Sequence, residues 1–330
     1  MDRVGVIGCR GIGVRHAQGI VGLEDAEVVA ACDLSTDQLD EFGQRFQETW
    51  PELKSYTSHR RMLDEQSLDI VSVATGDNAH AQLVVDAAEA GAKGIFCEKP
   101  LATTVEDGAR MLEACERNST VLSVDHTRRF MPMWAHAKEL IEAGEIGEVQ
   151  YIVGSLRGGR AMLYRNGTHS IDAICWYADA APEWVLADLE TGYEDYTEYR
   201  GDGGHDPATE PGAYGMIRFA NGVRAFYAGG SKTTPGPKST TEVIGSTGRL
   251  LMSGTEDGVL FRGEEAEPLP IPEWPVSGIE AGMQSLVRSV REGRPPTSTG
   301  RDAQRVVQVI AGFLQSQQEG HRPVTIPAER

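Results

Sequence analysis

The chain has 330 residues and a mass of 35.8 kDa, a length that fits two domains of ordinary size. Hydrophobic residues make up 40% and charged residues 24%, which is typical of a globular enzyme and excludes a disordered or fibrous chain. The formal net charge is −18, and a surface this acidic repels phosphate backbones and anionic lipid. We therefore expect binding neither to nucleic acid nor to a membrane surface.

Targeting signals and cysteines indicate the compartment. No apolar run approaches the roughly 18 residues that span a bilayer, and the first residues lead into a strand-like segment without a signal-peptide pattern. The five cysteines are scattered and form no CxxC pair, which argues against a disulfide framework or a zinc cluster. We expect a cytoplasmic protein without a metal site.

Residues 1–125 alternate between apolar runs and helical patterns. Ser35 is placed to cap a helix that buries Leu39, Phe42 and Phe46. Because the runs are apolar on both faces, they predict a doubly wound parallel sheet covered by helices on both sides. In chain order, the expected elements are strand 3–8, helix 12–21, strand 28–32, the helix after Ser35, strand 68–74, helix 78–90, strand 94–97, helix 104–117 and strand 121–124.

Residues 126–330 have a different pattern and predict a second, α+β domain with a large open sheet that is mostly antiparallel. Asn221-Gly222 is a strong signal for a two-residue hairpin. Segments 200–212 and 232–238 are rich in Gly, Pro and charge and predict loops. The expected elements are helix 133–143, strands 148–157, 184–193, 213–220, 223–231 and 240–245, and a final helix 302–318.

A glycine-rich turn, GCRGIG at residues 8–13, lies between the first strand and the first helix. Gly8 and Gly13 match the outer glycines of a dinucleotide fingerprint, whereas Arg10 replaces the middle one and Gly11 follows it. Asp33 lies 20 residues after Gly13, at the end of the second strand, where a carboxylate binds ribose hydroxyls. Its charge favours NAD over NADP, although Arg10 could offset that preference. The alternative is a tight turn followed by a helix-capping aspartate.

Two further segments follow strands of the same sheet. They are Thr75–His80 and Glu98-Lys99-Pro100, and the carboxyl ends of parallel strands are where doubly wound sheets bind ligands. A lysine among apolar strand residues can have a lowered pKa and can donate to a reacting oxygen. The alternative is a solvated loop lysine paired with Glu98.

A candidate acid–base pair lies in the second domain. His169 and Asp172 are three residues apart on a short predicted helix and therefore share a face. A carboxylate beside an imidazole can fix its tautomer and raise its basicity, as a general base needs. The alternative is a helix-start histidine with an aspartate in the first turn. No HExxH or GxSxG motif occurs, so neither a metalloprotease nor a serine hydrolase is indicated.

Several of these segments occur in an order that is typical of a known family; with their neighbours they are Val4–His16, Ala74–His80, Glu98–Ala102, Arg128–Pro132, Gly144–Glu148, Gly167–Asp172 and Glu242–Gly248. They span roughly residues 3–250 and resemble the Gfo/Idh/MocA oxidoreductases, which include glucose–fructose oxidoreductase and inositol dehydrogenase. The Glu98-Lys99-Pro100 motif and the helix with His169 and Asp172 are the most specific parts.

The resemblance implies an N-terminal Rossmann domain and a second domain whose open sheet forms a homo-dimer or homo-tetramer. It also implies NAD(P)-linked oxidation or reduction at a hydroxyl-bearing carbon of a sugar or cyclitol. Lys99 then lies beside the nicotinamide and the substrate hydroxyl, Glu98 reaches the nicotinamide-side ribose, and His169 is the acid–base residue. The expected cofactor-side residues are Gly8, Arg10, Gly11, Ile12, Gly13, Asp33, Thr75, Asn78, His80, Glu98 and Lys99, and the expected substrate-side residues are His126, Arg128, Arg157, Tyr164, Arg165, Asn166 and Trp176.

Three positions depart from the family pattern. Arg10 replaces the middle glycine, Gly76 stands where proline is common, and Arg165 stands where many members have an aspartate four residues before the histidine. Asp172 must then tune the histidine, or the chemistry differs; Arg165 is either a salt-bridged loop residue or a ligand for a substrate carboxylate or phosphate. Two other functions stay open: a glycoside-processing enzyme with transient NAD redox, and a regulator that only binds. His16 is expected to pack in the core.

Overall fold

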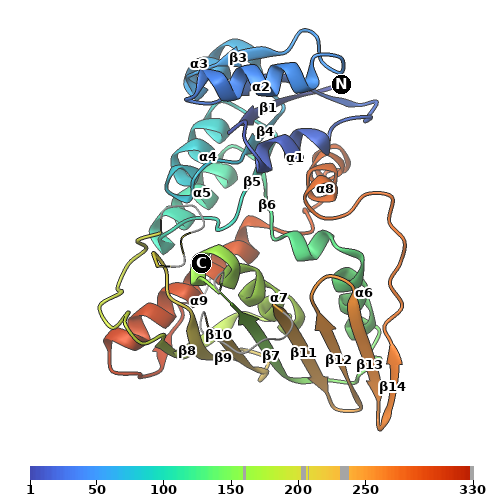
Figure 1. Ribbon diagram of the computed structural model, residues 1–330, viewed down its shortest axis with the longest axis vertical. Helices are drawn as coiled ribbons and strands as arrows, with labels where there is room; N and C mark the ends of the chain where they lie inside the picture. Colours follow the sequence, from blue (N-terminus) through green and yellow to red (C-terminus); the bar gives the residue numbers. More distant parts are fainter. Residues whose placement is uncertain (159–160, 202–205, 207, 231–237, 328–330) are drawn as a thin grey trace. The chain divides into compact units, whose positions relative to one another are not determined.

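A computed structural model describes residues 1–158, 161–201, 206, 208–230 and 238–327. The chain forms two compact units (Figure 1). The first comprises Met1–Ala102, Glu106–Phe130 and Val276–Arg301, and the second Thr103–Val105, Met131–Pro275 and Asp302–Arg330. Apart from the short stretch Thr103–Val105, the chain passes to the second unit after Phe130, returns to the first at Val276 and leaves it again at Asp302. The sequence analysis did not anticipate the return at Val276.

The first unit contains a six-stranded parallel sheet in the order β3-β2-β1-β4-β5-β6. This order confirms the predicted doubly wound sheet: β2 and β3 are added on one side of β1, and β4, β5 and β6 are added on the other side. The elements are β1 (Asp2–Ile7), α1 (Ile12–Gln18), β2 (Ala26–Cys32), α2 (Thr36–Phe46), β3 (Lys54–Tyr56), α3 (His59–Gln66), β4 (Ile70–Val73), η1 (Asp77–Ala79), α4 (His80–Glu89), β5 (Gly94–Cys97), α5 (Val105–Arg117), β6 (Val121–Val124), η2 (Thr127–Phe130) and α8 (Ile279–Glu292).

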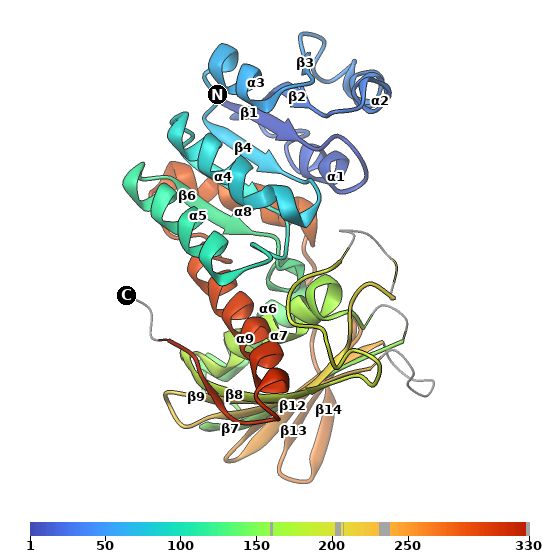
Figure 2. The ribbon, with the colours of Figure 1, turned by 90° about the vertical axis from the view of Figure 1, so that its left-hand side faces the viewer.

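Helices cover both faces of this sheet. Helices α1 and α8 pack together on one face, whereas α4 and α5 lie on the other (Figure 2). A Cβ atom at Gly94 of β5 would lie 2.5 Å from Val290 of α8, so the glycine lets this helix approach the strand closely. The cap of α2 is as predicted: Ser35 accepts a hydrogen bond from the N–H of Gln38, and the apolar side chains Leu39, Phe42 and Phe46 are buried.

The second unit contains a nine-stranded sheet in the order β14-β13-β12-β11-β7-β10-β9-β8-β15. Only the pair of β10 and β7 is parallel among the described strands, which confirms a mostly antiparallel sheet. The elements are α6 (Pro132–Glu142), β7 (Val149–Arg157), the π-helical turn η3 (Leu163–Gly167), α7 (Thr168–Ala178), β8 (Pro182–Leu189), β9 (Ala213–Phe219), β10 (Arg224–Gly230), β11 (Ser239–Gly245), β12 (Gly248–Ser253), β13 (Asp257–Arg262), β14 (Glu265–Pro268), α9 (Gly300–Gln318) and β15 (Val324–Thr325).

The loops expected at 200–212 and 232–238 lie partly outside the described residues, which leave out 202–205, 207 and 231–237. Within the described part, Asp206 starts a turn by accepting a hydrogen bond from the N–H of Ala208. None of the helices in the described ranges is both long enough and apolar enough to cross a membrane.

The hairpin between β9 and β10 has a three-residue loop, so the predicted two-residue loop is wrong. Arg218 pairs with Arg224, and the N–H of Gly222 donates to the carbonyl of Phe219. Only Gly222 has a positive φ there (94°), as in a type I turn followed by a glycine bulge, whereas a two-residue type I′ turn needs two such residues. Asn221 instead donates its side-chain amide to the carbonyl of Ala178.

Helix α9 packs through Phe313 on the buried face of the second sheet. This side chain is fully buried, and a Cβ atom at Gly215 of β9 would lie 2.5 Å from its ring. Strand β9 thus lacks a side chain where the ring packs on it. On the same helix Ser316 accepts a hydrogen bond from the N–H of Ala187 in β8.

We predict that Phe313→Ala lowers the free energy of unfolding by about 3–5 kcal/mol, because it leaves a cavity against the sheet that cannot collapse fully. Chemical denaturation monitored by tryptophan fluorescence measures the loss. Leu34→Ala is the control, since Leu34 is 92% exposed, and its change should stay within about 0.5 kcal/mol. Equal effects of the two substitutions would contradict the packing described for α9.

Candidate active site

The strands of the first sheet end level with one another. Ile7 of β1 pairs with both Cys32 and Val73, Val73 pairs with Cys97, and Cys97 pairs with Val124. Each of these is the last residue of its strand. The sheet therefore brings the residues that follow to one edge, where doubly wound folds bind ligands; they are Gly8, Asp33, Ala74, Glu98 and Asp125.

The glycine turn is tight and open toward solvent. A Cβ at Gly13 would lie 1.7 Å from the carbonyl oxygen of Gly8, and a Cβ at Gly8 would lie 2.3 Å from the carbonyl oxygen of Ala74. Gly11, at the start of α1, has a φ of 47° and no neighbouring atom within 4 Å of a Cβ position. No described side chain caps α1. The N–H of Gly13 donates to the carbonyl of Arg10 (2.9 Å), so the donors that can bind an anion are the other N–H groups at the start of the helix, beginning with that of Ile12.

Asp33 follows β2 directly, as predicted. Its Oδ2 accepts a hydrogen bond from the N–H of Cys9 (2.9 Å), and its Oδ1 accepts one from the N–H of Ser35 (2.9 Å). These bonds fix the carboxylate between the glycine turn and the start of α2. Each oxygen has a second lone pair with which it can accept from a ribose hydroxyl.

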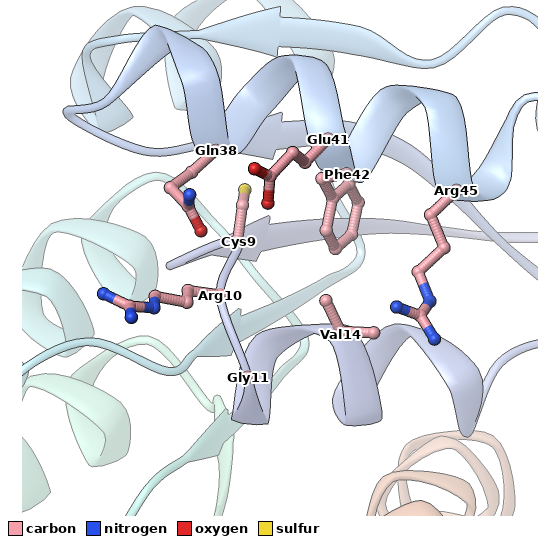
Figure 3. A pocket seen from close by; sticks show the side chains of 8 residues that line it. All are labelled: Cys9, Arg10, Gly11, Val14, Gln38, Glu41, Phe42 and Arg45. Atoms are coloured by element: carbon pink, nitrogen blue, oxygen red, sulfur yellow. The ribbon is translucent and has the colours of Figure 1, made fainter.

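A cavity of about 410 Å³ opens beside the glycine turn, between α1 and α2 (Figure 3). Arg10 lies at one end of this cavity and Arg45 at the other, with Phe42 of α2 facing Val14 of α1 between them. This volume is within the range of small-molecule sites, which start near 300 Å³. Asp33 is not among the residues that line it. The preference for NAD over NADP therefore does not follow from the cavity.

The segment after β4 is held to the segment after β5 by His80. The ring is fully buried, and its two nitrogens lie 2.9 Å from the carbonyl oxygen of Pro100 and 3.2 Å from that of Thr75. We had expected His80 on the cofactor side. In the structure it joins two loops, whereas Thr75 is partly exposed and Asn78 is exposed.

His16 is fully buried, as expected, but it does more than pack. Its ring lies beside Phe96, with centroids 4.8 Å apart, and it also bonds to Ser72 and to Glu98. Sequence reasoning missed this link because α1 and the end of β5 are 82 residues apart. Only the strand order brings His16 and Glu98 together.

Glu98 is a buried carboxylate next to a partly exposed lysine. Burial opposes ionisation of Glu98, but the hydrogen bond from His16 and the charge of Lys99 outweigh it and lower the pKa of Glu98 to about 2. Glu98 is therefore a permanent negative charge at this edge. His126 and Arg128 follow β6 in the same unit; His126 is buried and Arg128 is partly exposed.

In the second unit, the candidate segment begins in the π-helical turn before α7. Tyr164, which we expected on the substrate side, is buried in the hydrophobic core, with its ring 4.9 Å from that of Tyr199. Arg165 and Asn166, which follow, are partly exposed. Glu210 accepts hydrogen bonds from the N–H groups of Tyr164 (2.8 Å) and Arg165 (3.2 Å). No motif in the sequence indicated that role.

His169 and Asp172 lie on the first turns of α7, as predicted. His169 is partly exposed, whereas Asp172 is fully buried. Trp176 is also partly exposed, and positions 165, 169, 172 and 176 follow the spacing of one helical face. Arg157 ends β7 and is partly exposed. The second unit therefore presents a histidine and several polar or aromatic side chains from one short stretch of chain.

Two parts of the sequence match a known family. Residues 3–126 match the oxidoreductase family with an NAD-binding Rossmann fold, and residues 134–251 match the GFO/IDH/MocA C-terminal domain. The chain belongs to the Gfo/Idh/MocA oxidoreductases. This confirms the resemblance noted from the sequence motifs.

Relatives and solved structures agree with this assignment. The chain is 25% identical over 318 residues to myo-inositol 2-dehydrogenase of Thermotoga maritima, with 91% of each chain covered. It is 26% identical to D-apiose dehydrogenase of Paraburkholderia graminis, with 96% of this chain and 87% of the relative covered. The fold matches an aldose-aldose oxidoreductase of Caulobacter crescentus complexed with glycerol, with a TM-score of 0.81 at 21% identity over 98% of this chain and 99% of the other.

A second solved structure has the same fold. It is an oxidoreductase of Agrobacterium radiobacter in complex with NAD⁺, L-tartaric acid and magnesium, with a TM-score of 0.81, 19% identity and 98% of each chain covered. At this level of identity the match supports the fold alone.

The residues of this family member fit NAD. The glycine turn leaves room over Gly11 for a pyrophosphate, and the uncapped N-terminus of α1 supplies N–H donors for it. Asp33 stands at the end of β2, where the family fold binds the adenosine ribose. The exposed Arg10, which replaces the middle glycine, does not fill the space over Gly11.

We predict that Gly13→Ala weakens NAD binding at least about 10-fold, because the new Cβ would displace the backbone of Gly8 and widen the turn. Titration of tryptophan fluorescence with NAD measures the dissociation constant. Gly43→Ala is the matched control: it also lies in a helix, but nothing lies within 4 Å of its Cβ position. NAD affinity should be unchanged in the control, and an unchanged affinity for Gly13→Ala would contradict this account of the turn.

Proposed function

We propose that the protein is an NAD-dependent oxidoreductase that transfers a hydride between the nicotinamide and a hydroxyl-bearing carbon of a sugar, sugar derivative or cyclitol. One observation carries the proposal: Glu98 and Lys99 follow β5 at the edge of the sheet that also holds the glycine turn and Asp33. Inositol and apiose dehydrogenases among the relatives support a polyol as substrate.

On this proposal the first unit holds the cofactor. The N–H groups at the start of α1 bind the pyrophosphate, Asp33 accepts from the adenosine ribose, and Thr75 and Asn78 lie along the same edge. Glu98 accepts from the nicotinamide-side ribose. When bound, NAD supplies the carbon that accepts or donates a hydride.

Lys99 and His169 both act on the substrate hydroxyl, in different roles. The ammonium group of Lys99 donates a hydrogen bond to the substrate oxygen and stabilises the negative charge that develops there. A ring nitrogen of His169 takes the hydroxyl proton during oxidation and returns it during reduction. The buried carboxylate of Asp172, three residues later on α7, raises the basicity of His169, since Arg165 occupies the position of the usual aspartate.

Substrate recognition comes from side chains that are partly exposed. In the second unit these are Arg165, Asn166 and Trp176, with Arg157 at the end of β7. Amide and guanidinium groups donate to hydroxyl oxygens, and an indole ring packs on the apolar face of a sugar or cyclitol. Arg165 also suits a carboxylate on the substrate. In the first unit Arg128 is the partly exposed candidate, whereas the buried His126 supports the residues around it.

We predict that Lys99→Ala lowers kcat about 10²–10⁴-fold without a comparable loss of NAD affinity, because it removes a group that acts on the reacting oxygen. Absorbance at 340 nm with NAD, and separately with NADP, measures turnover across a panel of cyclitols, aldoses and sugar acids. Lys93→Ala is the matched control, since Lys93 precedes the same strand at its other end and forms an exposed ion pair with Asp69.

Each outcome of this assay separates the functions. Turnover that is lost in Lys99→Ala but kept in Lys93→Ala supports the dehydrogenase. Net glycoside cleavage without accumulation of NADH indicates transient redox instead. Tight NAD binding with no turnover in the wild type indicates a regulator and contradicts the proposal.

We further propose that the protein forms a homo-dimer or homo-tetramer through the outer face of the second sheet. Tyr151 on β7, Tyr214 on β9 and Phe226 on β10 lie on neighbouring strands, and each is at least 40% exposed. The register places them on one face of the sheet, because Phe226 pairs with Val153 and with Met216. An exposed apolar patch of this kind marks an association surface.

We predict that Phe226→Arg shifts the protein to a smaller species in size-exclusion chromatography with light scattering, because it places a charge in the centre of the apolar face. Arg224→Lys on the same strand keeps the charge of an exposed position and serves as control. Identical molar masses for wild type and Phe226→Arg would contradict this interface.

We place the protein in the cytoplasm. The five cysteines, Cys9, Cys32, Cys97, Cys115 and Cys175, are all buried and all free thiols. Burial raises the pKa of the Cys32 thiol to about 11 and that of Cys115 to about 12, so both stay protonated and unreactive at neutral pH. Free thiols without disulfides are typical of a reducing compartment.

A further inference from the structure

Four polar side chains meet in the apolar interior beneath the cofactor edge of the first unit. They are His16 of α1, Ser72 of β4, Glu98 after β5 and Asp125 after β6. His16, Ser72 and Asp125 are fully buried, and Glu98 is 8% exposed. Burying such groups is costly unless they satisfy one another, so their meeting requires an explanation.

The ring of His16 lies at the centre of this cluster. Its Nδ1 is 2.7 Å from the Oγ of Ser72, and its Nε2 is 3.3 Å from the Oε1 of Glu98 and 3.9 Å from the Oδ2 of Asp125. The hydroxyl of Thr127 donates to the other oxygen of Asp125 at 3.1 Å. Asp125 is therefore held in place from the side opposite His16.

This arrangement places a proton on Nε2. A ring nitrogen lone pair that faces two carboxylates would be repelled by both, whereas an N–H is attracted to both. Burial by itself lowers the pKa of His16, but the hydrogen bond with Glu98 and the nearby carboxylate of Asp125 raise it to about 9. Burial and the charge of Glu98 raise the pKa of Asp125 to about 6. The two carboxylates next to its Nε2 thus stabilise the protonated ring of His16.

Other charges surround the cluster. Lys99 is adjacent to Glu98 in the chain. Arg15 of α1 forms an ion pair with Glu280 of α8, with an N–O distance of 2.6 Å. The thiol of Cys97 is fully buried, and burial together with the charge of Glu98 raises its pKa well above its usual value, so it stays neutral. The charge of Asp77, in the segment after β4, also raises the pKa of Cys97.

We propose that His16 and Asp125 are positioning residues for the cofactor-side carboxylate: His16 fixes the orientation and the negative charge of Glu98, and Asp125 fixes His16. The proposal rests on the proposed function, in which Glu98 meets the ribose next to Lys99. Because its Oε1 is bound to the ring of His16, Glu98 presents its other oxygen in one orientation. A simple packing role for His16 needs neither carboxylate.

A divalent cation is the competing occupant of the same space. The three donor atoms, His16 Nε2 and one oxygen each of Glu98 and Asp125, lie within 4.8 Å of one another. The neighbouring charge of Lys99 disfavours a dication there, because Lys99 and a protonated His16 together already balance the two carboxylates. The experiment below separates the two.

The test compares His16→Gln and His16→Leu, because glutamine can still donate to Glu98 and leucine only fills space. His59→Gln is the matched control. His59 lies on α3, and its ring also bonds a carboxylate, that of Asp86 on α4, at 2.8 Å. NAD affinity is measured between pH 5 and 10, and ¹⁵N-histidine NMR of the apo protein follows the ring of His16. Asp125→Asn removes the second carboxylate with little change in shape.

We expect the His16 ring of the wild type to titrate near pH 9, and its pKa to fall in Asp125→Asn. Loss of a hydrogen bond to a charged group should weaken NAD binding about 10–100-fold in His16→Leu, and less in His16→Gln. Above about pH 9 the ring of His16 loses its positive charge, and the change in wild-type NAD affinity that accompanies this loss should be absent from both variants and present in His59→Gln.

Three results would overturn the proposal. The first is a His16 ring that titrates near its ordinary pKa in the wild type. The second is a His16→Leu protein that binds NAD as tightly as wild type with the same pH profile. The third is one equivalent of a divalent metal per chain in the purified protein. A wild type that does not bind NAD contradicts the proposed function instead, and the NMR titration still tests the cluster because it needs no cofactor.

Discussion

The level ends of the parallel strands are the constraint on which the candidate site depends. Parallel pairing of β1, β2, β4, β5 and β6 places the last residue of each strand in register with its neighbour. The residues that follow these strands therefore lie at one edge of the sheet. That is why a glycine turn, the aspartate after β2, a glutamate–lysine pair and the buried cluster around His16 occupy a single unit, although Gly8 and Asp125 are 117 positions apart in the sequence. The chemistry we propose follows from that register.

Features that rest on local sequence could be predicted. The alternation of apolar runs with helical patterns indicated the doubly wound sheet, and the spacing from Gly13 to Asp33 indicated the dinucleotide site. His169 and Asp172 fall on one helix because a three-residue spacing needs nothing beyond that helix. Likewise the glycine in Asn221-Gly222 indicated a reversal of the chain. The sheet and the helix that carries His169 and Asp172 are as predicted, because each depends on residues within one or two elements.

Features that rest on distant pairings could not be predicted. The His16 cluster needs α1, β4, β5 and β6 to be placed first, and the bond from Glu210 to the start of the candidate segment joins residues 46 positions apart. The packing of helix α8 could not be predicted because its partner surface belongs to the first unit, far back in the chain; the helix itself has an amphipathic pattern that the sequence analysis missed. The hairpin loop was one residue longer than predicted, since Asn221 binds Ala178 and leaves only Gly222 with a positive φ.

The central claim is direct hydride transfer between a polyol carbon and NAD. It is tested most directly by incubating the enzyme and NAD with cyclitols and aldoses that carry deuterium on every carbon, and by analysing the nucleotide by mass spectrometry. Our account predicts reduced nicotinamide that carries one deuterium from one class of these substrates. Reduced nucleotide without deuterium, or none from any sugar or cyclitol despite bound NAD, would contradict it.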